Sequence, residues 1–251
     1  MTTEKTLAAW IADLQHLDKN VRIEAALELG KLANVQALPA LLDRVGIEPD
    51  FFVRENVTWA LVRMGDAAVL PLITILERGD HASRLHAAHT LSKLADVRAV
   101  PALMATLDAS DNALVQKAVY ALGALRDERA LPALVARIGD TSGAFRSTLH
   151  DAVAAFGAHA VPSLLAVLAD AGNALARKVE VVEILGSIGC SDVMVPLANA
   201  LKDDAWEVRF AAVNALRRQS DAATVGTLAP ATQDPHPHVR LLATRAMQDL
   251  T

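Results

Sequence analysis

The sequence is poor in several residue types, and each shortage excludes a class of protein. A single cysteine, Cys190, in 251 residues leaves no internal disulfide and is typical of a reducing compartment. No apolar run approaches the ~18 residues that a membrane-spanning helix needs. The opening MTTEKTLAAW lacks the basic and apolar segments of a secretory signal. We therefore expect a soluble, cytoplasmic protein that does not enter a membrane.

Aromatic residues and positive charge are also scarce. Aromatics make up 4% of the chain, whereas hydrophobic residues make up 53%, which is too apolar for a disordered protein. The weight on alanine and leucine argues against a β-sandwich. The chain has 24 Lys and Arg against 29 Asp and Glu. Because binding a phosphate backbone needs a dense positive face, this composition argues against nucleic acid as a partner.

What the sequence does contain is a period of about 31 residues, which is the spacing of helical-repeat proteins. A basic column recurs at this interval, with Val115 out of pattern. Its members are Arg22, Arg54, Arg84, Arg146, Lys178, Arg209 and Arg240. An acid or a serine precedes the column where a helix N-cap belongs. These residues are Asp18, Asp50, Asp80, Asp111 and Ser142.

Each period predicts two short amphipathic helices. In VRIEAALELGKL the apolar residues recur every three or four positions, and the second helix opens with proline, as in PALLDRV. Neither helix is long enough to be stable alone, so successive pairs must stack. We predict an all-α fold, a right-handed α-solenoid of about seven helix pairs forming one domain over 1–251. The repeats fall near 18–45, 50–77, 80–107, 111–138, 142–168, 173–201 and 204–232, with half-repeats at 3–16 and 236–250.

The pattern D-x3-R-x2-A-x3-LG, followed by D-x2-A-x-PAL, is clearest at residues 18–45, 80–107 and 203–217. It resembles HEAT repeats of the short type first associated with phycobilisome bilin lyases. The resemblance covers practically the whole chain and is specific for the fold but not for an activity. In that family the recurring Asp and Arg form a ladder of contacts between repeats. It therefore implies a structural role here for Asp18, Arg22, Asp50, Arg54, Asp80, Arg84, Arg146, Arg209 and Arg240.

The arginine column has a second interpretation, a row of cations that binds carboxylates or phosphates. Arg22, Arg54, Arg84 and Arg209, however, each have an acid four or five residues earlier. A groove built for anions would not supply a counter-ion in so many repeats. We favour the structural interpretation, in which each arginine pairs with the N-cap acid of a neighbouring repeat.

Catalytic and metal-binding patterns are absent from the sequence. His86 and His89 can share a helix face, with His81 just upstream, but no acid lies nearby on that face. Deoxyhypusine hydroxylase, the metal enzyme of this fold, relies on repeated His-Glu pairs, and this chain has no His-Glu dipeptide. Cys190 has no histidine near it in the repeat register. We predict no catalytic residue, no metal site and no cofactor.

Two aromatics break a polar column. Phe51 and Trp206 stand three residues before an arginine, at a position that elsewhere tolerates lysine and asparagine. We expect them to be partly exposed and to be candidates for a binding hot spot. Trp10 and Trp59 fall on core columns and are predicted to pack. A second candidate surface is the small-residue inner face of the second helices, with the partner-binding candidates Asp43, Arg44, Thr74, Met104, Arg137 and Asn199.

These features favour a non-enzymatic scaffold or adaptor that binds another protein, as a helix or extended peptide, on its concave face. The alternative, which the resemblance suggests, is a bilin lyase-like or cofactor-loading subunit, and any enzymatic activity would then be of the lyase type. A nucleic-acid-binding solenoid, like the HEAT-like DNA glycosylases, is disfavoured by the acidic balance. The sequence leaves the oligomeric state open.

Overall fold

The structure is a computed structural model that describes residues 5–139, 143–170, 172–219 and 222–250. All regular secondary structure in these residues is helical, as the sequence predicts. The chain divides into two compact units, Met1–Leu125 and Arg126–Thr251, and the division falls inside the predicted fourth repeat. The N-cap predicted at Ser142 lies outside the described residues.

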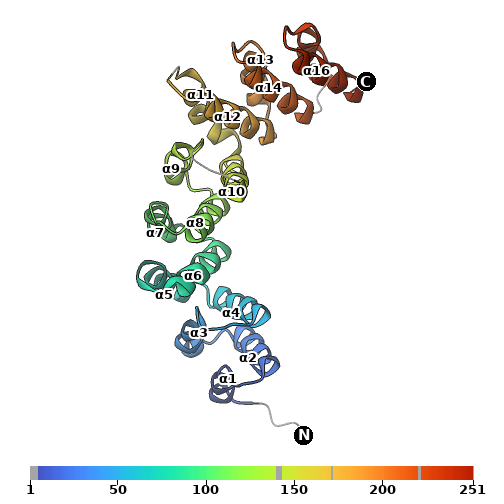
Figure 1. Cartoon of the computed structure of the whole chain (residues 1–251). Coiled ribbons are helices and arrows are strands. Elements are labelled where there is room, and N and C mark those ends of the chain that lie inside the picture. Colours follow the sequence, from blue (N-terminus) through green and yellow to red (C-terminus); the bar gives the residue numbers. More distant parts are fainter. Residues whose placement is uncertain (1–4, 140–142, 171, 220–221, 251) are drawn as a thin grey trace. The chain divides into compact units, whose positions relative to one another are not determined.

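The N-terminal unit consists of two layers of helices (Figure 1). The layer of first helices contains α2 (Lys19–Leu32), α4 (Phe51–Arg63), α6 (His81–Leu94) and α8 (Asn112–Leu125). The layer of second helices contains α1 (Leu7–Asp13), α3 (Leu38–Arg44), α5 (Asp66–Arg78) and α7 (Val100–Thr106). Short 3-10 turns at Val35–Ala37 and Val97–Ala99 lead into α3 and α7.

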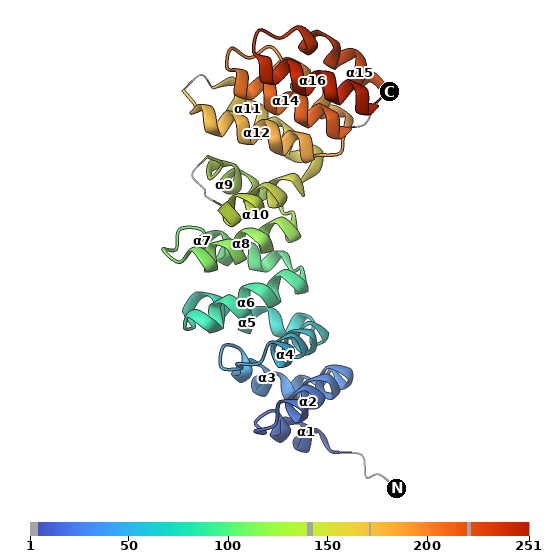
Figure 2. The same ribbon diagram turned by 45° about the vertical axis from the view of Figure 1, so that its right-hand side comes forward.

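The C-terminal unit has the same two layers. Its first helices are α10 (Gly143–Ala154), α12 (Leu175–Ser187), α14 (Trp206–Gln219) and α16 (Pro237–Leu250). Its second helices are α9 (Leu131–Ala136), α11 (Val161–Ala169), α13 (Met194–Ala200) and α15 (Ala222–Leu228). The 3-10 turns here are Glu128–Ala130, Gly157–Ala160, Ser191–Val193 and Ala229–Gln233. Figure 2 shows α12, α14 and α16 side by side in one layer.

No single helix in the described ranges is long and apolar enough to cross a membrane. One bent pair, Phe145–Ala154 with Gly157–Ala169, reaches the required length and apolarity only when its two helices, which meet at 109°, are counted together.

The aspartates predicted as N-caps do cap their helices. Asp18, Asp50 and Asp80 each accept a hydrogen bond from an amide of the first turn, and Asp111 accepts from Ala113 and Leu114. The leucines of the repeating columns are fully buried between the layers. They are Leu29, Leu61, Leu91, Leu122, Leu185 and Leu216 of the first helices and Leu41, Leu72, Leu103, Leu134, Leu164, Leu197 and Leu228 of the second.

One second helix departs from the predicted start. The repeat pattern, in which the second helix opens with proline, places Pro71 near a helix start, but Pro71 lies inside α5, which starts at Asp66. In other repeats a side chain such as Asn34 or Asp96 caps a separate 3-10 turn before the proline. Here Gly65, at φ +57°, makes no side-chain cap. Residues 66–70 therefore continue as one helix with the segment that follows.

Consecutive first helices touch at the glycine of the LG motif. A Cβ atom on Gly186 would lie 2.7 Å from Cα of Ala215 in the next first helix. A Cβ on Gly30 would lie 2.3 Å from the ring of Trp59. A side chain at either position would thus force the neighbouring helix outward. The glycine sets how closely two repeats can pack.

At four positions of the described chain, the arginine of the column ties a first helix to the turn before it. Nη1 of Arg22 donates to the carbonyls of His16 and Leu17, at 2.8 and 2.9 Å. The same two bonds, to the carbonyls six and five residues earlier, recur at Arg54, Arg209 and Arg240. Because these carbonyls would otherwise lack partners in the turn, the arginine fixes the angle at which the chain enters the helix.

The same side chain can also reach the next repeat. Nε and Nη2 of Arg22 hold the two carboxylate oxygens of Glu48 at 2.9 and 2.8 Å. In the C-terminal unit Arg209 holds Asp234 in the same bidentate way, at 2.7 and 2.9 Å. Each acid stands just before a proline and a helix start, in EPD and DPH.

The predicted pairing of arginines with N-cap acids is therefore wrong. The N-cap carboxylate of Asp50 already accepts hydrogen bonds from amides of its own helix. It also pairs with Lys19, the residue that follows the N-cap of the preceding repeat, at 3.0 Å. Arg84 instead donates to the carbonyl of Leu76 at 2.8 Å, and Arg146 to Glu183 at 2.7 Å.

Glu48 is the centre of a buried charge cluster. It is 3% exposed, and its two carboxylate oxygens accept hydrogen bonds from Arg22. Arg44 also pairs with one of these oxygens. Burial alone would raise the pKa of Glu48, but the hydrogen bonds from Arg22 and Arg44 hold it below the ordinary value of 4.5. In the C-terminal unit the bond from Arg209 likewise lowers the pKa of Asp234.

The glycine contact gives a first prediction. Gly186→Ala should destabilise the protein by about 1–3 kcal/mol, because the new methyl group overlaps the backbone of α14. Gly226→Ala is the matched control: it is also helical, and nothing lies within 4 Å of its added Cβ. The control should be neutral or more stable by about 0.5–1 kcal/mol from helix propensity. Urea unfolding compares them, and equal midpoints would contradict the close-contact account.

Glu48 gives a second prediction. Glu48→Gln should cost about 3–5 kcal/mol at pH 7, because it leaves two buried guanidinium groups without their counter-charge. Since the folded pKa is lowered, this stabilisation is present above pH 4.5 and is lost as the pH falls through the folded value. The difference in the free energy of unfolding between wild type and Glu48→Gln should therefore become smaller at acidic pH. Urea unfolding at several pH values tests this, with Glu28→Gln, from an exposed pair with Lys31, as the control.

Candidate functional site

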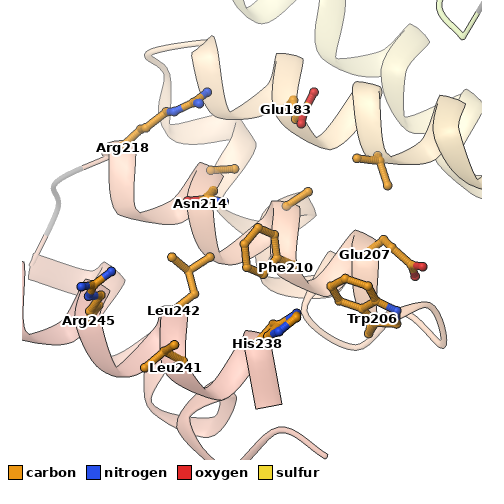
Figure 3. A pocket seen from close by; sticks show the side chains of 13 residues that line it. Glu183, Trp206, Glu207, Phe210, Asn214, Arg218, His238, Leu241, Leu242 and Arg245 are labelled. Carbon is orange, nitrogen blue, oxygen red and sulfur yellow. The ribbon is translucent and has the colours of Figure 1, made fainter. Parts of the chain in front are cut away.

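An apolar hollow of the C-terminal unit lies on the layer of first helices. It is an open groove of about 480 Å³ across α12, α14 and α16 (Figure 3). Its floor is apolar, and charged side chains stand at its ends. The lining residues are Val179, Glu183, Trp206, Glu207, Phe210, Ala211, Asn214, Ala215, Arg218, His238, Leu241, Leu242 and Arg245.

One end of the groove is an aromatic cluster. The Trp206 indole stacks on His236, with ring centroids 4.0 Å apart and planes 9° apart. Phe210, one turn further along α14, meets Trp206 edge to face at 6.2 Å, and His238 does so at 5.8 Å. Four rings, from α14, from α16 and from the bend just before α16, thus contact one another. Trp206 is partly buried as a result, and it lines the groove.

The charged residues of the groove are arranged by sign. Figure 3 shows Glu207 beside Trp206 at one end, and Arg218 and Arg245 at the opposite end, with Phe210 and Leu242 between them. Glu183 is already engaged by Arg146 of α10. Neither Arg218 nor Arg245 has an ion-pair partner in the described part of the chain. The arginine end is therefore a positive site without a counter-ion.

A second groove of about 470 Å³ lies on the first helices of the N-terminal unit, across α4, α6 and α8. Phe51 and Glu55 come from α4, His86 and His89 from α6, and Lys117 from α8. α6 packs less closely on α4 than on α5, which leaves this space open. Phe51 is 58% exposed and contacts Phe52, which is 63% exposed, edge to face at 5.6 Å.

The two aromatics that the sequence singled out each line the groove of their own unit. Phe51 and Trp206 occupy the same register, the first residue of a first helix. Phe51 is the more exposed, as expected for a polar column, whereas Trp206 is covered by His236. The prediction that Trp59 packs is only half right, because its ring lies over Gly30 but is 39% exposed.

The predicted inner face of the second helices is only partly available. Asp43, Thr74 and Asn199 are exposed, and Met104 and Arg137 are partly buried, with Arg137 lying 5.8 Å from the Phe145 ring. Arg44 was predicted to bind a partner, and this is wrong. It is 8% exposed and paired with Glu48, because the loop after α3 brings that acid back against it.

The histidines that suggested a metal are used within the fold. His86 is buried, and its Nε2 lies 2.8 Å from Oγ1 of Thr58. Burial lowers the pKa of His86 to about 4. His89 Nε2 lies 3.2 Å from Oε1 of Glu55, an acid that sequence reasoning missed because it belongs to the preceding repeat. Within the described ranges, no three His, Cys, Asp or Glu side chains are placed to hold a metal ion.

Several groove residues were also missed from the sequence, although a signal existed. In VRLLATRAM the buried positions of α16 are Val239, Ala243 and Ala246. The adjacent Leu241 and Leu242 cannot both face that seam, and Leu241 is 63% exposed. Two consecutive leucines outside the core stripe could have indicated an apolar surface.

Comparison with known proteins places the chain in a family. A sequence model of HEAT repeats matches residues 7–81, 69–154 and 161–248, so the chain belongs to the HEAT-repeat family. The structure is similar to that of the Escherichia coli protein YibA, with a TM-score of 0.51 and 14% sequence identity over 98% of this chain and 93% of that one. At this identity the likeness concerns the fold alone.

Two relatives are similar to parts of the sequence. Bilin biosynthesis protein PecE of Mastigocladus laminosus is 45% identical over 58 residues, which are 23% of this chain and 22% of PecE. Phycocyanobilin lyase subunit alpha of Picosynechococcus sp. (strain PCC 7002) is 39% identical over 108 residues, 39% of this chain and 40% of that subunit. The matches thus span less than half of each relative's length. They confirm the resemblance to the short HEAT type of the bilin lyases.

Proposed function

We propose that the protein is a bilin lyase-like subunit that holds a bilin on its C-terminal unit and works with a protein partner. The observation that carries this proposal is the groove of α12, α14 and α16, which has an apolar and aromatic floor and a positive end. A bilin is a linear tetrapyrrole, a conjugated and largely apolar chain of rings that carries carboxylates. The groove offers a surface of each kind that such a molecule requires.

The dimensions support a ligand of this size. Trp206 and Arg218 are separated by about 18 Å along α14, at about 1.5 Å per residue. A volume of about 480 Å³ lies within the range of small-molecule sites, roughly 300–1,000 Å³. The names of the two relatives, which refer to bilin biosynthesis and to a phycocyanobilin lyase, support the bilin over other apolar acids.

The proposal predicts direct binding of a bilin. Free phycocyanobilin titrated into the protein should show saturable changes in visible absorbance and circular dichroism. Leu241→Glu places a charge on the apolar floor and should weaken the apparent affinity about tenfold or more, since burial of a leucine contributes about 1.5–3 kcal/mol.

The matched control for that titration is Val195→Glu, at a residue that is 70% exposed on the second helices of the same unit. This variant should bind like wild type. Titration curves of wild type without saturation, or equal affinities for Leu241→Glu and Val195→Glu, would refute the groove as the bilin site.

A second candidate function, a protein-interaction scaffold, is favoured by the N-terminal unit. Ile47, Phe51 and Phe52 are each more than half exposed and lie within six residues. Exposed phenylalanines rimmed by charge are typical of binding hot spots. The two functions are compatible, because a subunit that delivers a bilin needs a surface for an acceptor or a companion chain. We place that surface at Phe51 and Phe52.

This placement predicts a separation of functions. The double variant Phe51→Ala, Phe52→Ala should lose the protein that wild type captures from its native host, with a loss of at least about 1 kcal/mol for each hot-spot residue. Its phycocyanobilin titration should be unchanged. Quantitative mass spectrometry of affinity captures measures the first effect, and undiminished capture by the double variant would rule out this surface.

A further inference from the structure

The positive end of the C-terminal groove carries two guanidinium groups, which the binding of an apolar ligand would not require. Arg218 of α14 and Arg245 of α16 approach it from two neighbouring helices (Figure 3). Two charged side chains near this end have ion-pair partners: Arg217 lies 3.5 Å from Asp249, and Glu183 is bound by Arg146. Arg218 and Arg245 both line the groove, and neither has an ion-pair partner among the described residues.

Two guanidinium groups at one end of an apolar groove fit a ligand with carboxylates at one edge. A linear tetrapyrrole carries its two propionates on the inner rings, and its lactam N–H groups on the outer rings. In its coiled form the propionates project from one edge of the molecule. Guanidinium groups bind carboxylates in charge-assisted, often bidentate hydrogen bonds.

The other end of the groove, at Trp206 and Glu207, is complementary in chemistry to the outer rings of the tetrapyrrole. Glu207 has no ion-pair partner within the described ranges, so its carboxylate can accept hydrogen bonds from lactam N–H groups. Trp206, stacked on His236, supplies an aromatic ring beside it in the lining of the groove. The groove therefore has a polarity, with an acceptor and an aromatic at one end and two cations at the other.

We propose that Arg218 and Arg245 bind the propionate carboxylates of the bilin, and so fix its orientation with the outer rings toward Trp206 and Glu207. This inference rests on the proposed function and adds to it the chemical feature of the ligand that the site recognises. Recognition of propionates distinguishes a bilin from apolar molecules of the same size. Because both arginines are exposed, binding should also depend on salt.

The test compares two probes, phycocyanobilin and its dimethyl ester, which lacks the carboxylates but keeps the chromophore. Wild type should bind the ester about tenfold more weakly or worse than the free acid, as expected for the loss of a charge-assisted bond. Arg218→Gln and Arg245→Gln should each weaken binding of the free acid about tenfold. Neither substitution should change the affinity for the ester.

The control variant is Arg217→Gln, which removes a guanidinium next to the groove but outside its lining, and which should bind both probes like wild type. Circular dichroism in the far ultraviolet checks that each variant is folded. Arg218→Lys should restore part of the affinity for the free acid, because the charge remains while the bidentate geometry is lost.

The outcomes separate this inference from the proposed function. Equal affinities of wild type for acid and ester, or unchanged acid binding by both glutamine variants, would overturn carboxylate recognition while a Leu241→Glu defect still supported the groove. Absence of binding of either probe to wild type would overturn both. Loss of ester binding in the arginine variants would show that the arginines shape the groove instead of recognising carboxylates.

Discussion

In each unit, one junction between repeats depends on a bidentate bond from a guanidinium in one repeat to a carboxylate just before the next first helix. Arg22 with Glu48, and Arg209 with Asp234, each use one nitrogen for the preceding turn and two for the following repeat. The carbonyl of the same acid then accepts a bond from the next arginine of the column, Arg54 or Arg240. Such a pair holds two repeats in a fixed arrangement. Removal of one partner would destabilise the fold, because it leaves the other charge unpaired in a poorly hydrated place.

This junction and the glycine contact together determine which side chains of the first helices lie on the outer surface. With α12 and α14 in close contact at Gly186, and with α16 oriented by Arg240, three first helices form one surface in the C-terminal unit. Residues outside the buried stripe, such as Phe210, Leu241 and Leu242, must then lie on that surface. The groove is thus a consequence of a regular repeat that carries irregular residues on its outer stripe. Because the junction and the glycine contact use other positions, these outer residues can differ from one repeat to another.

Much of the fold could be predicted from the sequence, because it depends on local signals. Asp18 and Asp50 cap their helices, and Leu29 and Leu41 enter the core, since helix periodicity and capping act within a few residues. The partners of the arginines could not be predicted in the same way. Glu48 lies 26 residues from Arg22, outside every aligned column, and only the Glu-Pro and Asp-Pro pairs before the helices hint at its role. The burial of Arg44 and the exposure of Trp59 likewise depend on how neighbouring repeats meet. Of the site, the sequence predicted Phe51 and Trp206 but placed the main surface on the second helices.

The central claim is that the first helices of the C-terminal unit hold a bilin. Hydrogen–deuterium exchange with and without saturating phycocyanobilin tests it most directly, because it reports where binding suppresses opening of the helices. The account predicts slower exchange in α14 and α16, over residues 206–218 and 237–250, with no change in α4 and α6. Protection confined to α4 and α6, or to the second helices, would contradict it.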